Sequence, residues 1–191
     1  MNRYCLLCVG LLVAMMVLPC RAVMEPLSTE ELVMAADAVV VGRVTAKQAA
    51  WAPGHSKIVT TYQVLITEMV AGYLPGSVVE VQHDGGVVGE VGQQVSDVAE
   101  MKAGDNVLLF LSPTLSGSTA PASRLSKNTP GGICHVVGQA QGRYFISADG
   151  VASKRGYDVI GASEKIDVKL SRGTLVAKIR ALWSTKAVSA P

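Results

Sequence analysis

The residues best suited to chemistry begin with a thiol beside an imidazole. Cys134 and His135 are adjacent in the chain, and a cysteine nucleophile needs a nearby base. Neighbouring residues of a strand point to opposite faces, however, so these two side chains are expected to diverge. His83 and Asp84 meet the same objection at the end of a strand. We therefore expect Cys134 to be a small buried apolar side chain, or less often an exposed thiol, rather than a nucleophile.

A metal site would have to come from the three histidines of the chain. These are His55, His83 and His135. They are far apart in the sequence, and their separations match none of the short ligand spacings typical of zinc sites. We expect no metal.

Glycines at every third position suggest a phosphate-binding loop. Gly86, Gly89 and Gly92 follow a Gly-x-x-Gly-x-x-Gly rhythm, but a dinucleotide loop also needs a strand before it, a helix after it and a later acidic residue. That context is missing, so a mobile or bulged glycine loop is favoured. The chain also has no Gly-x-Ser-x-Gly elbow. These patterns favour a protein that is not an enzyme and binds no cofactor.

The N-terminal segment, residues 1–22, is typical of a cleavable signal peptide. Arg3 provides a positive charge, and residues 4–19 form an uncharged apolar run that is too short to span a bilayer comfortably, which takes about 20 residues. Small residues at Cys20 and Ala22 predict cleavage before Val23. An uncleaved anchor is the alternative. We expect an exported protein, periplasmic or secreted, with no membrane span after cleavage.

The remaining chain is formally neutral and has a single cysteine. The whole sequence has 17 Lys and Arg against 15 Asp and Glu, and the two surplus cations, Arg3 and Arg21, lie in the expected signal peptide. The other basic residues are scattered, whereas nucleic-acid binders gather theirs on one face, so no nucleic-acid partner is expected. Cys134 is the one cysteine outside the signal peptide, so the apolar core must hold the fold without disulfides.

Apolar periodicity predicts one mainly β domain over residues 23–184, followed by a flexible tail at 185–191. Ser28 and Glu31 form a capping box that opens a short helix ending at Ala35. Near the C-terminus, Leu175, Ile179 and Leu182 share one face of a closing helix. A flexible loop is expected at 114–131, and a hairpin is expected between the last two strands about Gln141-Gly142. The expected strands are 39–44, 58–70, 77–83, 107–111, 133–139 and 143–147.

Three of these segments carry a resemblance to a known family. The segments 36–44 and 104–111, with Tyr62-Gln63-Val64 before Gly72, resemble the OB-fold barrel of netrin-like and TIMP-like domains. The likeness is closer still to uncharacterised secreted bacterial proteins with Gly85-Gly86, a glycine-rich stretch and then the Val-Leu-Leu-Phe-Leu strand. It covers roughly residues 30–148 and implies a single OB-like antiparallel β-barrel with short N-terminal and C-terminal helices. We expect a core that includes Val40, Tyr62, Val64, Leu109 and Phe110.

The resemblance is better evidence for the fold of this chain than for its activity. TIMP-like inhibitors act, as the resemblance implies, through an N-terminal cysteine locked by disulfides, and the mature chain has neither. In OB-like barrels the loop between the first two strands commonly carries recognition. Here that loop, residues 48–57, contains Trp51 and His55. An exposed tryptophan would be a contact residue, although it could equally fold back to plug the end of the barrel.

The sequence therefore predicts a cofactor-free binding or interaction module. Its expected partner is a protein or an envelope component, contacted through Trp51 and His55. An unassigned extracytoplasmic hydrolase is the alternative.

Overall fold

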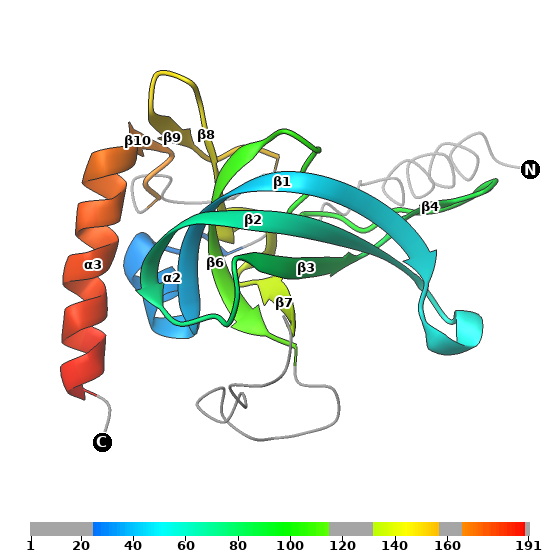
Figure 1. The fold of residues 1–191 in the computed structure, drawn as a ribbon, viewed down its shortest axis with the longest axis horizontal. Helices are drawn as coiled ribbons and strands as arrows, with labels where there is room; N and C mark the ends of the chain where they lie inside the picture. Colours follow the sequence, from blue (N-terminus) through cyan, green and yellow to red (C-terminus); the bar gives the residue numbers. More distant parts are fainter. Residues whose placement is uncertain (1–24, 115–131, 157–165, 190–191) are drawn as a thin grey trace, which may run out of the picture.

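The computed structural model describes residues 25–114, 132–156 and 166–189. The expected signal peptide and nearly all of the expected loop at 114–131 lie outside these residues. Strands make up the largest share of the described chain, as the sequence predicts, and two helices flank them (Figure 1). The helical elements are α2 (Thr29–Ala35), η1 (Pro53–His55), η3 (Gln139–Gly142) and α3 (Arg172–Ser189). The strands are β1 (Ala38–Trp51), β2 (Ile58–Gly72), β3 (Val78–Asp84), β4 (Gly86–Val88), β5 (Val91–Gln93), β6 (Asn106–Pro113), β7 (Ile133–Val136), β8 (Arg143–Ile146), β9 (Val151–Ser153) and β10 (Lys169–Ser171).

Five strands form a closed ring of hydrogen-bonded neighbours, in the order β1-β2-β3-β7-β6 and back to β1. β1 pairs with β2 along its whole length and with β6 only from Ala38 to Arg43. Four of the five pairs are antiparallel, and β3 with β7 is parallel. The expectation of a wholly antiparallel arrangement is therefore wrong at this pair. An odd number of strands cannot alternate in direction all the way round a ring, so one parallel pair is unavoidable.

The second edge of β6 is divided between two strands. β7 pairs with Leu111–Pro113, and β8 pairs with Val107–Leu109. The expected hairpin between these two strands is therefore wrong, because each bonds to β6. The chain between them takes left-handed conformations at Gly138 (φ 65°) and Gln139 (φ 54°) and then forms η3. After this turn the chain pairs with β6, as β8, and does not fold back to pair with β7. β8 then pairs with β9, and β9 pairs with β10.

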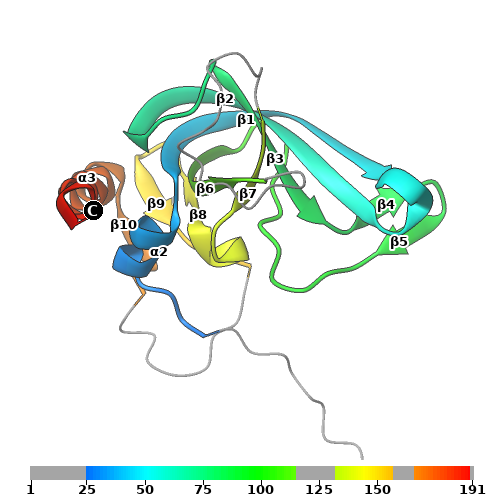
Figure 2. The same ribbon diagram turned by 90° about the horizontal axis from the view of Figure 1, so that it is seen from below.

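Because both faces of β1 and β6 are covered, the protein has two apolar cores. Val40 and Leu109 point into the core enclosed by the ring, whereas Val39 and Phe110 point outward against α2 and α3. Figure 2 shows the two helices together at the end of the molecule away from β4 and β5. All five residues expected in the core are fully buried, with Phe110 in the outer core and the other four, Val40, Tyr62, Val64 and Leu109, in the inner one.

Both end helices form where the sequence predicts them. The Ser28 hydroxyl accepts a hydrogen bond from the Glu31 amide (3.2 Å), and the Glu31 carboxylate accepts one from the Ser28 amide (2.8 Å). α3 buries Leu175 and Ile179 as expected. The helix continues to Ser189, so residues 185–189, assigned to a flexible tail, are helical.

Two features explain the longer helix. No glycine or proline interrupts the sequence between Gly173 and Pro191. The Lys186 ammonium also donates to the main-chain carbonyls of Val33 (3.0 Å) and Ala36 (2.6 Å) at the end of α2, which ties the last turns of α3 to the fold. Within the described ranges, no helix is both long and apolar enough to cross a membrane.

Candidate functional site

The far halves of β1 and β2 extend past β6 as a ribbon, and β3 pairs with the other edge of β2 as far as Asp84 opposite Val59 (Figure 1). Beyond Arg43, β1 no longer pairs with β6, but its pairing with β2 runs on to Trp51 opposite Ile58. The side chains of residues 45–51 are exposed or half-buried. A register shift between Val44 and Ala46 marks the point where the ribbon leaves the ring, as a bulge that bends a strand would.

The ribbon tip carries the two residues singled out as contacts. Trp51 is the last residue of β1, and η1 follows it with Gly54 at φ 78° and His55 at φ 55°. This turn brings the indole and imidazole rings to a centroid distance of 5.7 Å, tilted by 31°. Trp51 keeps 36% of its surface exposed and belongs to neither core. The structure therefore places the indole on the surface and not as a plug in the ring.

Hydrogen bonds and an ion pair fix the conformation of the tip. The Ala52 amide donates to the Lys57 carbonyl (2.8 Å), and the His55 amide donates to the Ala52 carbonyl (2.9 Å). The Lys57 ammonium pairs with Asp84 at 2.8 Å. The tip is thus joined to β3 as well as to its own ribbon.

The glycine-rich segment forms a hairpin beside this ribbon. β4 and β5 pair about a turn at Gly89, which has φ 60°. A Cβ at Gly86 would lie 2.5 Å from the Thr60 hydroxyl, so a glycine there lets the hairpin approach β2. The expected mobile or bulged glycine loop is thus an ordered hairpin. No helix follows it, and the segment lacks the geometry of a dinucleotide loop.

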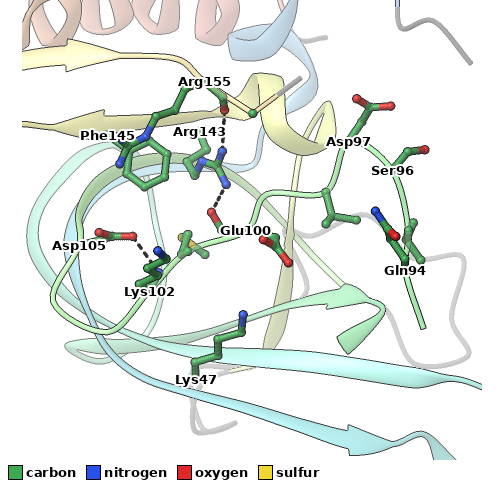
Figure 3. A pocket seen from close by; sticks show the side chains of 14 residues that line it. Lys47, Gln94, Ser96, Asp97, Glu100, Lys102, Asp105, Arg143, Phe145 and Arg155 are labelled. Carbon is green, nitrogen blue, oxygen red and sulfur yellow. Dashed lines mark hydrogen bonds between the residues drawn. The ribbon is translucent and has the colours of Figure 1, made fainter. Parts of the chain in front are cut away.

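A cleft of about 560 Å³ opens at one end of the ring, and we call it the mouth cleft (Figure 3). One wall comes from β1 and another from β8 and the residues after β9. The irregular segment 94–105 completes it. The lining residues are Lys47, Gln94, Val95, Ser96, Asp97, Val98, Glu100, Met101, Lys102, Asp105, Arg143, Phe145, Arg155 and Gly156.

Arg143 is the most unusual residue of the mouth cleft, since its side chain is only 2% exposed. Its Nη1 atom donates to the Glu100 carbonyl, and its Nη2 atom donates to the Arg155 carbonyl at 2.8 Å. The Nε atom is buried without a partner. Burial lowers the pKa of this guanidinium to about 10, so it still carries a full charge at neutral pH.

The ring of Phe145 holds two guanidinium groups in place. Arg143 lies 4.4 Å and Arg155 3.8 Å from its centroid, distances at which cation–π attraction operates. Two strand residues, Arg143 and Phe145, face the mouth cleft, while Tyr144 between them points into the outer core. Strand alternation thus divides three consecutive residues between a polar cleft and an apolar core.

Charges of both signs line the mouth cleft. The cations are Lys47, Lys102, Arg143 and Arg155, and the acids are Asp97, Glu100 and Asp105. Lys47 lies over the Tyr62 ring at 5.7 Å, and the Asp105 carboxylate accepts a hydrogen bond from the Lys102 amide (2.8 Å). The sum of these formal charges is one positive.

A buried hydrogen-bond chain runs behind Met101, on the floor of the mouth cleft. The Tyr62 hydroxyl accepts from the Met101 amide (3.2 Å) and lies 3.0 Å from Nε2 of His83. The other ring nitrogen of His83 lies 2.7 Å from the Asp84 carbonyl, so Nδ1 carries the proton and Nε2 accepts from Tyr62. Burial lowers the pKa of His83, which favours this neutral form.

The remaining residues considered for chemistry do not form a reactive group. Cys134 is 1% exposed, and burial raises its pKa to about 11, whereas His135 on the next position is exposed. His83 and His135 line a second hollow of about 390 Å³, but His55 is not among its residues. Among residues 25–114, 132–156 and 166–189, no three His, Cys, Asp or Glu side chains are placed to hold a metal ion.

The chain matches no protein-family model and no curated protein. Its chemistry must therefore be argued from the two places just described, the ribbon tip and the mouth cleft. Both are suited to binding. The tip offers an exposed aromatic pair, and the mouth cleft offers fixed charges.

The sequence predicts contacts at the tip and gives no prediction for the mouth cleft. A lone arginine in a short strand is usually an exposed residue, so the sequence alone does not predict the burial of Arg143. The available signal for its burial is that Phe145 lies two positions further along the same strand, so the two side chains share one face. A charged residue and an aromatic residue on the same face indicate a half-buried cation.

Proposed function

We propose that this chain is an exported, cofactor-free binding module with an OB-like barrel, and that it contacts a protein or envelope component through the ribbon tip. The observation that carries the proposal is the exposed Trp51 indole, held against His55 at the end of the ribbon. Tryptophan is among the residues enriched in the dominant contacts of protein interfaces.

The strand ring supports the OB-like assignment. An OB-fold is a five-stranded, partly open Greek-key barrel that binds through the loop between its first two strands. The ring here also has five strands, its order is not sequential, and β1 pairs with strands on both sides. Trp51 lies at the start of the corresponding β1–β2 connection, and His55 lies within it.

The fixed conformation of the tip favours binding as well. Ordering a flexible loop on association lowers affinity, and a loop that is already ordered avoids this loss. The backbone hydrogen bonds at Ala52 and His55 and the ion pair from Lys57 to Asp84 hold the tip before any partner arrives. The indole can then bury its exposed surface with little reorganisation.

The test is capture from an envelope extract with the chain that begins at Val23. A matched pair of variants is Trp51→Ala and Tyr73→Ala, because Tyr73 is an aromatic residue with 68% of its surface exposed outside the ribbon tip. We expect a specific partner that the Trp51 variant loses and the Tyr73 variant keeps. With the purified partner, the loss should be about thirtyfold in Kd, the size of a dominant interface contact.

Two results would contradict this proposal. Equal capture by the wild type and the Trp51 variant would remove the tip as the contact. Turnover in a broad hydrolase screen of the same preparation, unaffected by either variant, would favour the hydrolase alternative.

A further inference from the structure

We propose that the mouth cleft is a second binding site, independent of the ribbon tip, which takes the carboxylate group of a small hydroxy or amino acid. Nothing in the ribbon-tip proposal uses this cleft, since Trp51 and His55 are not among its lining residues.

The first support is the buried charge of Arg143, which makes no direct ion pair with a described acid. Both of its hydrogen bonds go to neutral main-chain carbonyls, and the ion pairs between described residues do not include it. Glu100 and Asp105 favour the charged guanidinium without pairing with it directly, and a buried donor without an acceptor, such as Nε, is unfavourable. A carboxylate in the cleft would add a further negative charge close to Arg143.

The second support is the arrangement of the other cations. Arg155 is exposed and stacks on the same phenyl ring as Arg143, so two guanidinium groups share one wall (Figure 3). Guanidinium is planar and presents paired donors that match a carboxylate, and stacking on an aromatic ring orients it beforehand. Lys47 lies across the mouth cleft, where its flexible ammonium can approach a bound anion.

The third support concerns selectivity, which the acids of the mouth cleft provide. The lining has a net formal charge of +1. A bound monoanion therefore neutralises the site, whereas a dianion such as phosphate leaves it with a net negative charge. Asp97 and Ser96 lie on the side opposite Arg143 and Arg155 in Figure 3. Their oxygens can accept hydrogen bonds from a hydroxyl or ammonium group. A small ligand with a carboxylate at one end and a hydrogen-bond donor at the other is a hydroxy acid or an amino acid.

The size of the mouth cleft agrees with a small ligand. Its volume of about 560 Å³ lies within the range of roughly 300–1,000 Å³ for small-molecule sites. Val95 and Val98, which are half-buried, add apolar surface for a short carbon chain. Such sites are common in the mouths of closed sheets.

The experiment titrates four probes into the ¹⁵N-labelled protein at constant ionic strength. The probes are L-lactate, acetate, inorganic phosphate and ethanolamine. We expect saturable amide shifts at residues 96–102 and 143–145 with L-lactate, weaker ones with acetate, and none that saturate with phosphate or ethanolamine. Phosphate binding tighter than L-lactate would overturn the carboxylate assignment, and the absence of saturable binding by L-lactate would overturn the site.

Variants separate this site from a general charge effect. Arg143→Lys keeps the charge but loses the two carbonyl hydrogen bonds that orient it, and Arg155→Gln removes an exposed cation. Each should weaken L-lactate at least about tenfold, the worth of a charged hydrogen bond. Lys169→Gln removes an exposed lysine outside the mouth cleft and should change nothing. If Arg143→Lys fails to fold, Arg155→Gln decides the outcome alone. Unchanged affinity in Arg155→Gln would refute the proposal.

The ribbon-tip variant keeps the two proposals distinguishable. Trp51→Ala should bind L-lactate like the wild type, because Trp51 does not line the mouth cleft. Equal loss of L-lactate binding in Trp51→Ala and Arg155→Gln would show that the two surfaces act as one site and would overturn the independence proposed here.

Discussion

Replacing Lys154 by methionine is expected to stabilise the protein. Lys154 follows β9 and is only 5% exposed, and its Nζ atom has no hydrogen-bond partner. The ammonium lies 4.7 Å from the centroid of the Tyr144 ring. The acid that stabilises its charge, Asp167, is already bound by Lys178 and Thr29, each at 2.7 Å. Lys154 therefore keeps a charge in an apolar site with little compensation.

The magnitude follows from the titration of this amine. Burial lowers the pKa of Lys154 from 10.5 to about 8, which corresponds to about 3 kcal/mol of unfavourable free energy when the amine is charged. Below pH 8 the amine is charged in both states, so the folded protein bears the whole penalty. Between pH 8 and 10.5 the folded protein releases the proton first, and stability rises. Methionine keeps the apolar stem and loses the attraction to Tyr144, worth about 1 kcal/mol.

We therefore expect Lys154→Met to raise the free energy of unfolding by about 2 kcal/mol at pH 7. Urea denaturation at pH 7 and at pH 10 measures the difference, with Lys169→Met, an exposed lysine in β10, as the matched control. The advantage over the wild type should shrink at pH 10. A variant that is less stable than the wild type at pH 7, or an advantage that stays constant up to pH 10, would refute this reasoning.

Other expected outcomes concern the core, the thiol and the buried histidine. Leu109→Ala should lower stability by about 2 to 5 kcal/mol, because Leu109 is fully buried in the ring; an unchanged denaturation midpoint, compared with the exposed control Leu65→Ala, would contradict it. Native Cys134 should resist alkylation at neutral pH, since burial raises its pKa to about 11, and Cys134→Ala should keep the fold. Rapid labelling or a disulfide-linked dimer would argue against this. Stability should fall as the pH drops below 6.5, because the unfolded chain then binds a proton at His83. The folded protein lowers the pKa of His83 and binds that proton only at a lower pH. Urea denaturation should show a smaller loss of stability at low pH in His83→Gln than in the wild type. An identical loss would exclude His83 as its source.

Strands with strong periodicity could be predicted from the sequence. In β2 the alternation of Ile58, Thr60, Tyr62 and Val64 matches the buried face residue by residue. The run Val107–Leu111 has no polar residue, and the structure buries all five side chains on both faces. Patterns of this kind record local burial, which is a property of each strand by itself.

Pairing could not be predicted in the same way. The glycine at Gly142 signals a turn, but it does not say that the strands on either side of that turn both pair with β6 and not with each other. The parallel pair of β3 and β7 joins residues far apart in the sequence, and no local pattern encodes it. The mouth cleft has the same origin, because it forms where β1, β8 and the segment 94–105 meet.

The divided edge of β6 bears on how the protein resists proteolysis. β6 supplies side chains to both cores and bonds to β1, β7 and β8. Neither half of the molecule can come apart while this strand stays in place, so the ring and the helix-covered side should unfold in one cooperative step. Partly open forms, which proteases cut most readily, would then be scarce. A protein without disulfides among its described residues would owe much of its resistance to proteolysis to this one strand.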